Sequence, residues 1–132
     1  MCLKAAAEMR RVLTPGSIAH LTIHLWSSLS GGHEKKFWNG GMPAHLSVPW
    51  MHLRDAQWTT EIPLNRWRRE DYLKEFRTHF EVLASDVETE LGRKLVTTEI
   101  LATLPDYSVE ELATELWVVV LRKPPSAHLT DR

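Results

Sequence analysis

The sequence predicts an α/β domain in which three strands pack beside helices, and three observations support this class. Stretches with helical periodicity alternate along the chain with β-prone stretches. Residues 18–25 form a β-prone run that is apolar on one face and only mildly polar on the other. Residues 116–123 are apolar on both faces, which is typical of a central strand. With 132 residues, the chain is long enough for one core.

The first expected elements are a helix, a turn and a strand. Apolar residues recur on one face of residues 3–13, which predicts an amphipathic helix. Pro15 disfavours helical geometry at the residue before it, and Gly16 can adopt the positive φ of a type II turn. The strand at residues 18–25 follows. Because neither of its faces is strongly polar, we expect both faces to be covered.

A long irregular segment follows this strand. Between residues 27 and 65 the periodicity disappears, and glycine pairs, prolines, tryptophans and histidines are frequent. Irregular segments of this length are usually functional or disordered, and the aromatic content favours a folded one. We therefore expect a lid or insertion beside a binding site.

The second half of the chain returns to regular patterns. The expected elements are a helix at 66–79, a strand at 80–89, a short helix at 97–103, a helix opened by the capping-box pattern at 108–111, and the final strand at 116–123. Pro124 and Pro125 end that strand, and we expect residues 126–132 to form a flexible tail.

Charge and composition bear on the compartment and on partners. The chain has 16 basic and 17 acidic residues and a net charge of -1, which gives no general attraction to nucleic acid. The apolar run 116–121 is far shorter than the ~20 residues of a membrane-spanning helix. The N-terminus lacks the apolar region of a secretory signal, and the lone Cys2 cannot form an internal disulfide. We expect a cytoplasmic protein that binds neither nucleic acid nor membranes.

Several stretches, taken in order, resemble a known family. They are MRRVLTPGSIAHLTI, SGGHEKKFWN, PWMHLRD, PLNRWRREDYLKEF, HFEVL and YSVEELATELWVVVLRKP. Together they resemble the C-terminal half of class I S-adenosylmethionine-dependent methyltransferases, from Ala5 to Pro124. The resemblance implies that residues 1–125 form part of a Rossmann-like sheet containing the fifth, sixth and seventh strands. It also implies that the irregular segment is the substrate-side insertion.

The chain departs from the family at the cofactor site. Ser17 stands where a second glycine is usual, a change that the turn tolerates. The sequence contains no glycine-rich turn of the G-x-G-x-G kind and no acidic residue following one. Neither Gly31-Gly32 nor Gly40-Gly41 lies between an expected strand and a helix start. The resemblance therefore implies S-adenosylmethionine as cofactor of the complete fold, but not one that this chain binds alone.

Two functions follow as expectations. The first is a methyltransferase for a small-molecule or glycan-type acceptor, truncated or working as half of an enzyme and inactive alone. In the family the fifth strand pairs with the fourth and the seventh, and the fourth has no counterpart here. The strand from Ile18 to Leu25 should therefore present an open apolar edge. The alternative is a non-enzymatic assembly or binding module that uses this edge to form a homodimer or to complement an N-terminal lobe.

The candidate site residues lie mainly in the irregular segment. His33 follows the carboxyl end of the first strand, where α/β sheets bind ligands, and it either serves as a general base or caps the loop. Trp38, Trp50, His52 and Arg66 are candidate contacts for the acceptor. The tryptophans have an alternative role, which is to pin the loop to the core. Arg66 can bind an anionic acceptor, be solvated or form a salt bridge.

The remaining histidines give weaker indications. His20 and His24 share a strand face but are roughly 13 Å apart, too far to bind one metal ion. We expect them to be hydrogen-bonded beneath a covering helix. His45 and His52, with Glu34 and Asp55, lack the spacing of a strong metal motif, so we expect no metal site.

Overall fold

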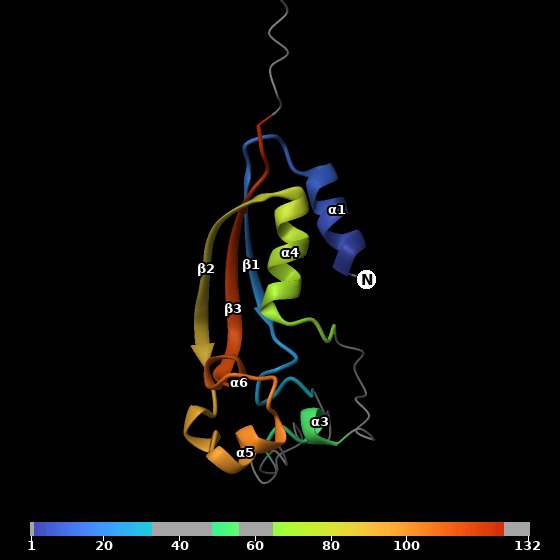
Figure 1. Cartoon of the computed structure of the whole chain (residues 1–132). Coiled ribbons are helices and arrows are strands. Elements are labelled where there is room, and N and C mark those ends of the chain that lie inside the picture. The colour runs from blue at the N-terminus through green and yellow to red at the C-terminus, as the bar shows by residue number, and fades with distance from the viewer. Residues whose placement is uncertain (1, 33–48, 56–64, 126–132) are drawn as a thin grey trace, which may run out of the picture.

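The computed structural model describes residues 2–32, 49–55 and 65–125 (Figure 1). Its elements in chain order are α1 (Cys2–Val12), β1 (Ile18–His24), α3 (Met51–Arg54), α4 (Arg69–His79), β2 (Glu81–Glu90), the 3-10 helix η2 (Arg93–Leu95), α5 (Thr98–Thr103), α6 (Val109–Ala113) and β3 (Thr114–Arg122). The expected α/β class is confirmed, and the expected strands and longer helices occur in the expected order, but α3 and η2 were not expected. Among the described residues, no helix is long and apolar enough to cross a membrane.

The three strands form one sheet in the order β1-β3-β2. Both outer strands run antiparallel to β3, so β1 and β2 point in the same direction (Figure 1). The register of β1 and β3 is continuous from Ile18 opposite Arg122 to His24 opposite Leu116. The register of β2 and β3 shifts at three places, the first of them between Val82 and Ala84. The apolar run near the C-terminus is therefore the central strand, as expected.

The turn after α1 joins this helix to the sheet. Gly16 has a φ of 81°, in the left-handed region that favours glycine, and its N–H donates to the carbonyl of Lys123 at 2.9 Å. The Lys123 Nζ donates to the carbonyl of Leu13 at 2.6 Å, which satisfies an end group of the helix. The predicted turn thus places α1 against the end of the sheet.

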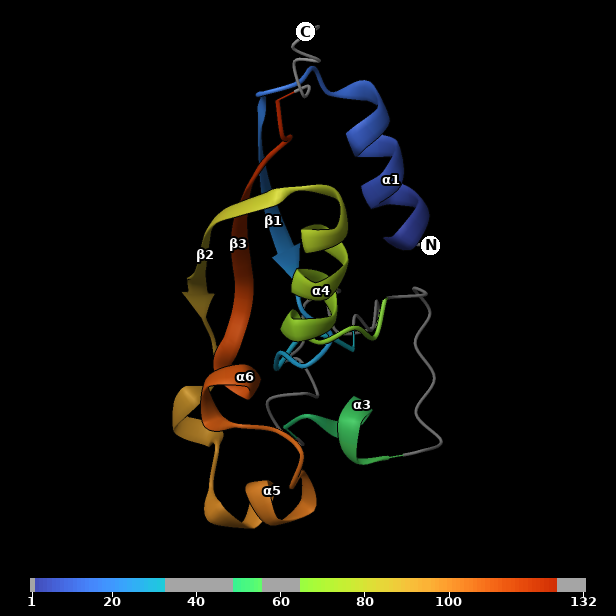
Figure 2. The same cartoon turned by 45° about the horizontal axis from the view of Figure 1, so that its top comes forward.

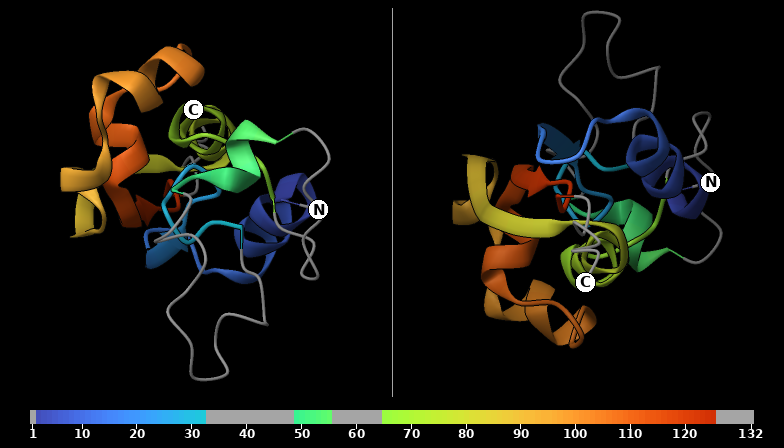
Figure 3. Two further views of the ribbon diagram at one scale, coloured as in Figure 1. Left: turned by 90° about the horizontal axis from the view of Figure 1, so that it is seen from below. Right: turned by 90° about the horizontal axis from the view of Figure 1, so that it is seen from above.

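Helices α1 and α4 lie side by side on one face of the sheet (Figures 2 and 3). Their buried side chains pack on three residues of β3 that are fully buried, Trp117, Val119 and Leu121. The alternate residues of β1, Ala19, Leu21 and Ile23, are partly buried against the same core. The period-two pattern of the sequence thus identifies the inward face of β1 correctly.

The expectation that both faces of β1 are covered is wrong. Ile18, His20 and Thr22 are exposed, and the exposed fraction of Ile18 is 52%. The physical reason is that α1 and α4 pack on the same face of the sheet. The outward residues of β1 combine apolar and weakly polar types, so their pattern does not distinguish a covered face from an open one.

A second, smaller core lies beyond the carboxyl end of β1. Its buried residues are Leu29, Trp50, Ile100, Leu104 and Leu112, which come from the loop after β1 and from the short helices. This places α3, α5 and α6 together below the sheet (Figure 1). The irregular chain after β1 is therefore anchored by its own hydrophobic cluster over the residues that the structure describes.

Two predicted boundaries shift. The helix expected from residue 66 begins at Arg69, because the N–H of Arg68 donates to the Asp71 carboxylate at 2.9 Å and so caps the helix. The final strand begins at Thr114, directly after α6, whose N-terminus is capped by the Ser108 hydroxyl. The expected tail, residues 126–132, lies outside the described residues.

Candidate functional site at the carboxyl end of strand β1

Four polar side chains meet where β1 ends and β3 begins. The Nε2 atom of His24 lies 3.1 Å from Ser28 Oγ, 3.0 Å from Ser30 Oγ and 3.1 Å from Glu115 Oε1. Ser30 also donates a hydrogen bond to the Glu115 carboxylate. The arrangement brings together a histidine at the end of one strand, two serines from the next turn and a carboxylate from the neighbouring strand.

The Glu115 carboxylate is the most buried charged group of this cluster, with a side chain 15% exposed. Burial raises the pKa of Glu115, but hydrogen bonds from His24 and Ser30 outweigh burial, and the net pKa is lowered from 4.5. Glu115 is therefore ionised at neutral pH. An ionised carboxylate accepts a hydrogen bond, so we infer that the His24 Nε2 carries a proton.

One oxygen of the cluster is incompletely satisfied. Glu115 Oε2 is buried and has no hydrogen-bond partner among the residues that the structure describes. A buried carboxylate oxygen without a partner costs free energy, so it is a place where a donor group of a ligand would be favoured. A carboxylate that orients a histidine is also a common basis of acid–base chemistry.

The side chains of His52 and Arg66 both contact the Trp26 ring, which lies on the same loop. His52 Nε2 hydrogen-bonds the Trp26 carbonyl at 2.8 Å, and the two rings meet edge to face with centroids 4.9 Å apart. The Arg66 guanidinium lies 4.8 Å from the Trp26 ring centroid, within cation–π range. His52 and Arg66, two of the predicted acceptor contacts, are therefore brought to one tryptophan that the prediction did not include.

The two glycines of the loop, Gly31 and Gly32, allow Trp26 and His52 to lie this close to the chain. A Cβ on Gly31 would lie 2.2 Å from the Trp26 carbonyl oxygen, and a Cβ on Gly32 would lie 3.0 Å from the His52 Cβ. The two glycines therefore allow the chain to fold back closely on its own residues. Glycine is needed at both positions because any side chain would meet these neighbouring atoms.

The other predicted residues have different positions. Trp50 is fully buried in the smaller core, which fits the alternative of a tryptophan that pins the loop. Its Nε1 has no hydrogen-bond partner among the described residues. His33 and Trp38 lie outside the described residues. Of the two strand histidines, His24 is hydrogen-bonded as expected, whereas His20 is exposed and that expectation is wrong for it.

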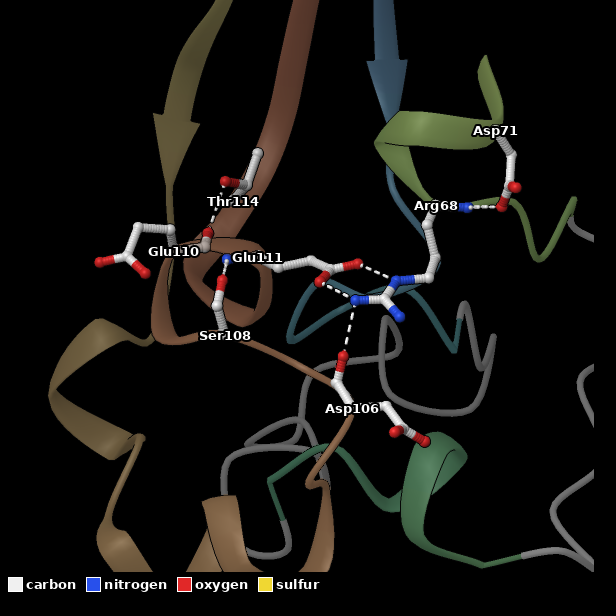
Figure 4. Close-up of polar contacts among 7 residues, drawn as sticks. All are labelled: Arg68, Asp71, Asp106, Ser108, Glu110, Glu111 and Thr114. Carbon is white, nitrogen blue, oxygen red and sulfur yellow. Dashed lines mark hydrogen bonds and ion pairs between the residues drawn. The ribbon is translucent and has the colours of Figure 1, made fainter. Parts of the chain in front are cut away.

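An arginine at the start of α4 joins the two cores (Figure 4). Arg68 donates from Nε and Nη2 to the two Glu111 carboxylate oxygens, at 2.6 and 2.5 Å, and from Nη2 to the Asp106 carbonyl at 2.7 Å. Its guanidinium also lies 4.8 Å from the Tyr107 ring centroid. The hydrogen bonds to Glu111 raise the pKa of the Arg68 guanidinium above its ordinary high value. Arg68 is thus a structural tie between α4 and α6, whereas Arg66 is exposed and lies over the Trp26 ring.

The two edges of the sheet differ in charge. The sequence of β1, IAHLTIH, contains no acidic residue, lysine or arginine, whereas β2, EVLASDVETE, carries acidic residues at Glu81, Asp86, Glu88 and Glu90. Charges on an edge strand oppose pairing with another strand. Among the strands that the structure describes, β1 is an edge strand without such charges.

The hydrogen-bond pattern identifies which backbone groups face outward. Leu25 N–H donates to the Glu115 carbonyl, and Lys123 N–H donates to the Ser17 carbonyl, so odd-numbered residues of β1 bond to β3. In an antiparallel pair the alternate residues direct their N–H and C=O groups away from the partner. Ile18, His20, Thr22 and His24 therefore direct these groups away from β3.

An apolar groove runs beside this edge, between α1 and α4. It has a volume of about 360 Å³, and its lining includes Ala6, Met9, Leu21, Ile23 and Phe76. We call it the β1 groove. It places an apolar surface next to β1, which is an edge strand among those that the structure describes.

The four glycines that the structure describes lie in turns or in close packing contacts. Gly16 lies in the turn before β1, Gly31 and Gly32 face their own chain, and Gly92 closes on the Leu29 side chain. Gly92 follows β2 and caps a helix, but that helix, η2, is a single 3-10 turn of three residues, and the Leu29 side chain fills the space beside the glycine. Within the same ranges, no group of three or more histidine, cysteine or acidic side chains is arranged to hold a metal ion.

Comparison with known proteins gave no match: no family model, no curated protein and no solved structure resembles the chain significantly.

The sequence analysis missed the cluster around Glu115. Ser28 and Ser30 looked like ordinary loop residues, and Glu115 looked like part of the approach to an apolar strand. One signal was present, because Glu115 is the only charged residue between Thr114 and Leu121. A charge at the start of a buried central strand requires a partner. Pairing β1 with β3 places Glu115 opposite Leu25, one position from His24.

Proposed function

We propose that this chain is the acceptor-binding side of an S-adenosylmethionine-dependent methyltransferase and acts only when a cofactor-binding lobe joins it at the β1 edge. The observation that carries the proposal is the pairing of β1 with β3, with the polar cluster at the carboxyl end of β1. This is the pairing that the family resemblance implies for its fifth and seventh strands. Ligands of α/β sheets bind beyond the carboxyl ends of strands, which is where the cluster lies.

The chain's own residues supply acceptor binding and proton handling. Arg66 can hold an anionic substituent while it stacks on Trp26. The His24–Glu115 pair can take up the proton of an acceptor hydroxyl or amine, because the carboxylate stabilises the imidazolium that forms. Since the described residues do not fit the cofactor, we assign no step of methyl transfer to this chain alone.

The first test is cofactor binding by the purified chain. Calorimetry with S-adenosylmethionine should detect no binding, because no described residues form a cradle for it. Micromolar affinity would contradict the proposal that a separate lobe binds the cofactor while this chain binds the acceptor.

The second test is activity in context. An extract of the native cells, depleted of this protein, should regain transfer of labelled methyl groups to small polar acceptors when the purified chain is added back. The His24→Ala variant should not restore this transfer, whereas His20→Ala, a change at an exposed histidine of the same strand, should restore it fully. Equal restoration by both variants would refute the role given to His24.

A second candidate function is an assembly module without chemistry of its own. The contrast between the uncharged β1 edge and the acidic β2 edge favours it, because that contrast concerns strand pairing alone. It predicts that a labelled peptide with the sequence of β1 binds the chain, and that Thr22→Pro abolishes binding by removing an outward N–H. Undiminished binding to the Thr22→Pro variant would exclude the edge as the binding surface.

A further inference from the structure

We propose that the β1 groove binds a small organic cation, an alkylammonium ion whose charged head lies at the Glu75 carboxylate and whose aliphatic part lies among the apolar side chains of the groove. The inference goes beyond the proposed function, because it uses neither Arg66 nor the His24–Glu115 pair. It depends on three properties of the groove, which are its size, its charge and its aromatic side chains.

The groove has the size and the lining of a small-molecule site. Its volume of about 360 Å³ lies within the range of about 300–1,000 Å³ that is typical of ligand pockets. Helix α1 contributes Ala5, Ala6 and Met9 to the lining, and β1 contributes Leu21 and Ile23. Such a lining favours the aliphatic part of a ligand, because burial there removes apolar surface from water.

One acidic side chain is set into this apolar lining. Glu75 of α4 lines the groove, and its side chain is only 14% exposed. Its Oε1 atom lies 3.2 Å from His79 Nε2, and this is the one ion pair of the carboxylate among the described residues. A carboxylate can accept about four hydrogen bonds, and a largely buried charge requires compensation. A cationic group in the groove would supply that compensation.

The lining selects a cation over an anion. Among the described residues that line the groove there is no lysine or arginine, so an anionic ligand would meet the Glu75 carboxylate without a compensating charge. The histidine of the lining, His24, already lies against the Glu115 carboxylate. The Arg10 guanidinium donates to the His79 carbonyl and does not line the groove.

Three aromatic residues, Trp67, Tyr72 and Phe76, also line the groove. The rings of Trp67 and Tyr72 meet edge to face with centroids 5.4 Å apart, and the centroids of Tyr72 and Phe76 are 6.1 Å apart. Aromatic rings attract cations electrostatically, and aromatic rings beside a carboxylate suit alkylated ammonium groups. A quaternary ammonium group fits such a lining better than a primary one, because its surface is apolar and it has no N–H group to leave without an acceptor.

A neighbouring hollow provides a contrast. It has a volume of about 270 Å³, shares Trp67 and Glu75 with the β1 groove, and is lined further by Asp71, Lys74 and Thr78. The Lys74 ammonium would repel a ligand cation there, and this lining offers little apolar surface to an aliphatic chain. Of the two hollows at Glu75, the β1 groove is therefore the one that suits an alkylammonium ion.

The first experiment compares three probes that have the same hexyl chain and different charges: hexyltrimethylammonium, hexanol and hexanesulfonate. Calorimetry of the whole chain should show that the cation binds roughly ten-fold more tightly than the anion, with the alcohol between them. In protein labelled at the methionine methyl groups, the Met9 resonance should shift on titration with the cation, because Met9 lines the groove. The Met9→Leu variant identifies that resonance.

The second experiment uses two matched pairs of variants. Glu75→Gln keeps the size of the side chain and removes its charge, so it should weaken binding of hexyltrimethylammonium about ten-fold and leave that of hexanol unchanged. Glu70→Gln, at an exposed position of the same helix outside the lining, should change neither. Ala5→Phe places a ring in the groove and should abolish binding of every probe. Ala7→Phe, at an exposed position of α1 outside the lining, should not.

Each outcome bears on the proposal. Failure of hexyltrimethylammonium to bind at millimolar concentration overturns it. Equal affinity for the cation and the anion overturns the assignment of a cation, and undiminished binding to Ala5→Phe overturns the assignment to this groove. Circular dichroism verifies that each variant is folded, and if Glu75→Gln is not, Ala5→Phe and the three probes still decide the result. Because the tests involve no methyl transfer, their failure would leave the proposed function unaffected, and failure of the proposed function would leave this site intact.

Discussion

Gly31 and Gly32 form a matched pair for testing the loop that carries the candidate site. Both are buried, and neither has a positive φ, so alanine meets only steric resistance at each position. A Cβ on Gly31 would lie 2.2 Å from the Trp26 carbonyl oxygen and 2.8 Å from that of Leu25. A Cβ on Gly32 would lie 3.0 Å from the His52 Cβ and 3.2 Å from its Nδ1. The first contact demands a backbone movement, and the second a small side-chain adjustment.

The expected magnitudes follow from these overlaps. Relief of the Gly31→Ala contact requires a shift of about 1 Å between two backbone segments, which places its cost near the upper part of the range of about 1–3 kcal/mol for overpacking. Gly32→Ala requires only a few tenths of an ångström and should cost about 0.5–1 kcal/mol. For a chain of this size, the melting temperature should fall by roughly 4 °C per kcal/mol, hence by roughly 8–12 °C for Gly31→Ala.

Urea unfolding of both variants provides the measurement, with the midpoint as readout and an unchanged slope as the sign that the unfolded state is unaffected. The test depends on which of the two variants loses more free energy of unfolding, and less on the absolute values. If Gly32→Ala were as destabilising as Gly31→Ala, or more so, the close approach of Gly31 to the Trp26 carbonyl would be refuted. The assignment of Trp26 as the platform for His52 and Arg66 would be refuted with it.

Three further predictions concern the contacts around the two cores. Arg68→Ala should lower the free energy of unfolding by about 1–2 kcal/mol, a value reduced for the partial exposure of Arg68, since Glu111 loses a bidentate partner. Arg68→Lys should restore only part of this, because lysine cannot form the two-point contact, and full recovery in urea titrations would contradict the geometry. Ser85→Ala should cost about 1–2 kcal/mol, because it leaves the buried Trp117 Nε1–H without its 3.0 Å partner; a neutral result by calorimetry would show that this N–H has another acceptor. The lowered pKa of Glu115 stabilises the fold above its ordinary value of 4.5, and this contribution is lost as the pH falls through the folded-state pKa. The stability of Glu115→Gln, measured between about pH 6 and about pH 3, should therefore fall less steeply than that of the wild type, and parallel curves would refute the assignment.

The fold could be predicted because its signals are local. The Pro15-Gly16 turn, the alternation in β1 and the Ser108 cap each depend on a few neighbouring residues, and each element was found within a few positions. The coverage of β1 could not be predicted, because it depends on which face α4 packs against. That choice is made by residues far apart in sequence, such as Tyr72 and Trp117, whose rings lie 6.0 Å apart.

The candidate site was only partly predictable for the same reason. His52 and Arg66 were selected by residue type, whereas Trp26, which both contact, was not selected. The cluster at Glu115 joins residues separated by 85 positions in the chain, so no spacing rule applies to it. What the sequence did contain was the requirement for a partner, since a carboxylate in a buried strand must be paired.

The position of that carboxylate links the site to the open edge. Glu115 contacts His24, and the N–H and C=O of His24 are among the backbone groups that β1 presents outward. A strand added at this edge would pair beside Thr22, two residues before the histidine whose side chain belongs to the cluster. Pairing there would restrict the movement of His24 and hence fix its geometry toward Glu115. On this argument the edge and the polar cluster form one functional unit, so Thr22→Pro, which changes no side chain of the cluster, should weaken both association and any chemistry that His24 supports.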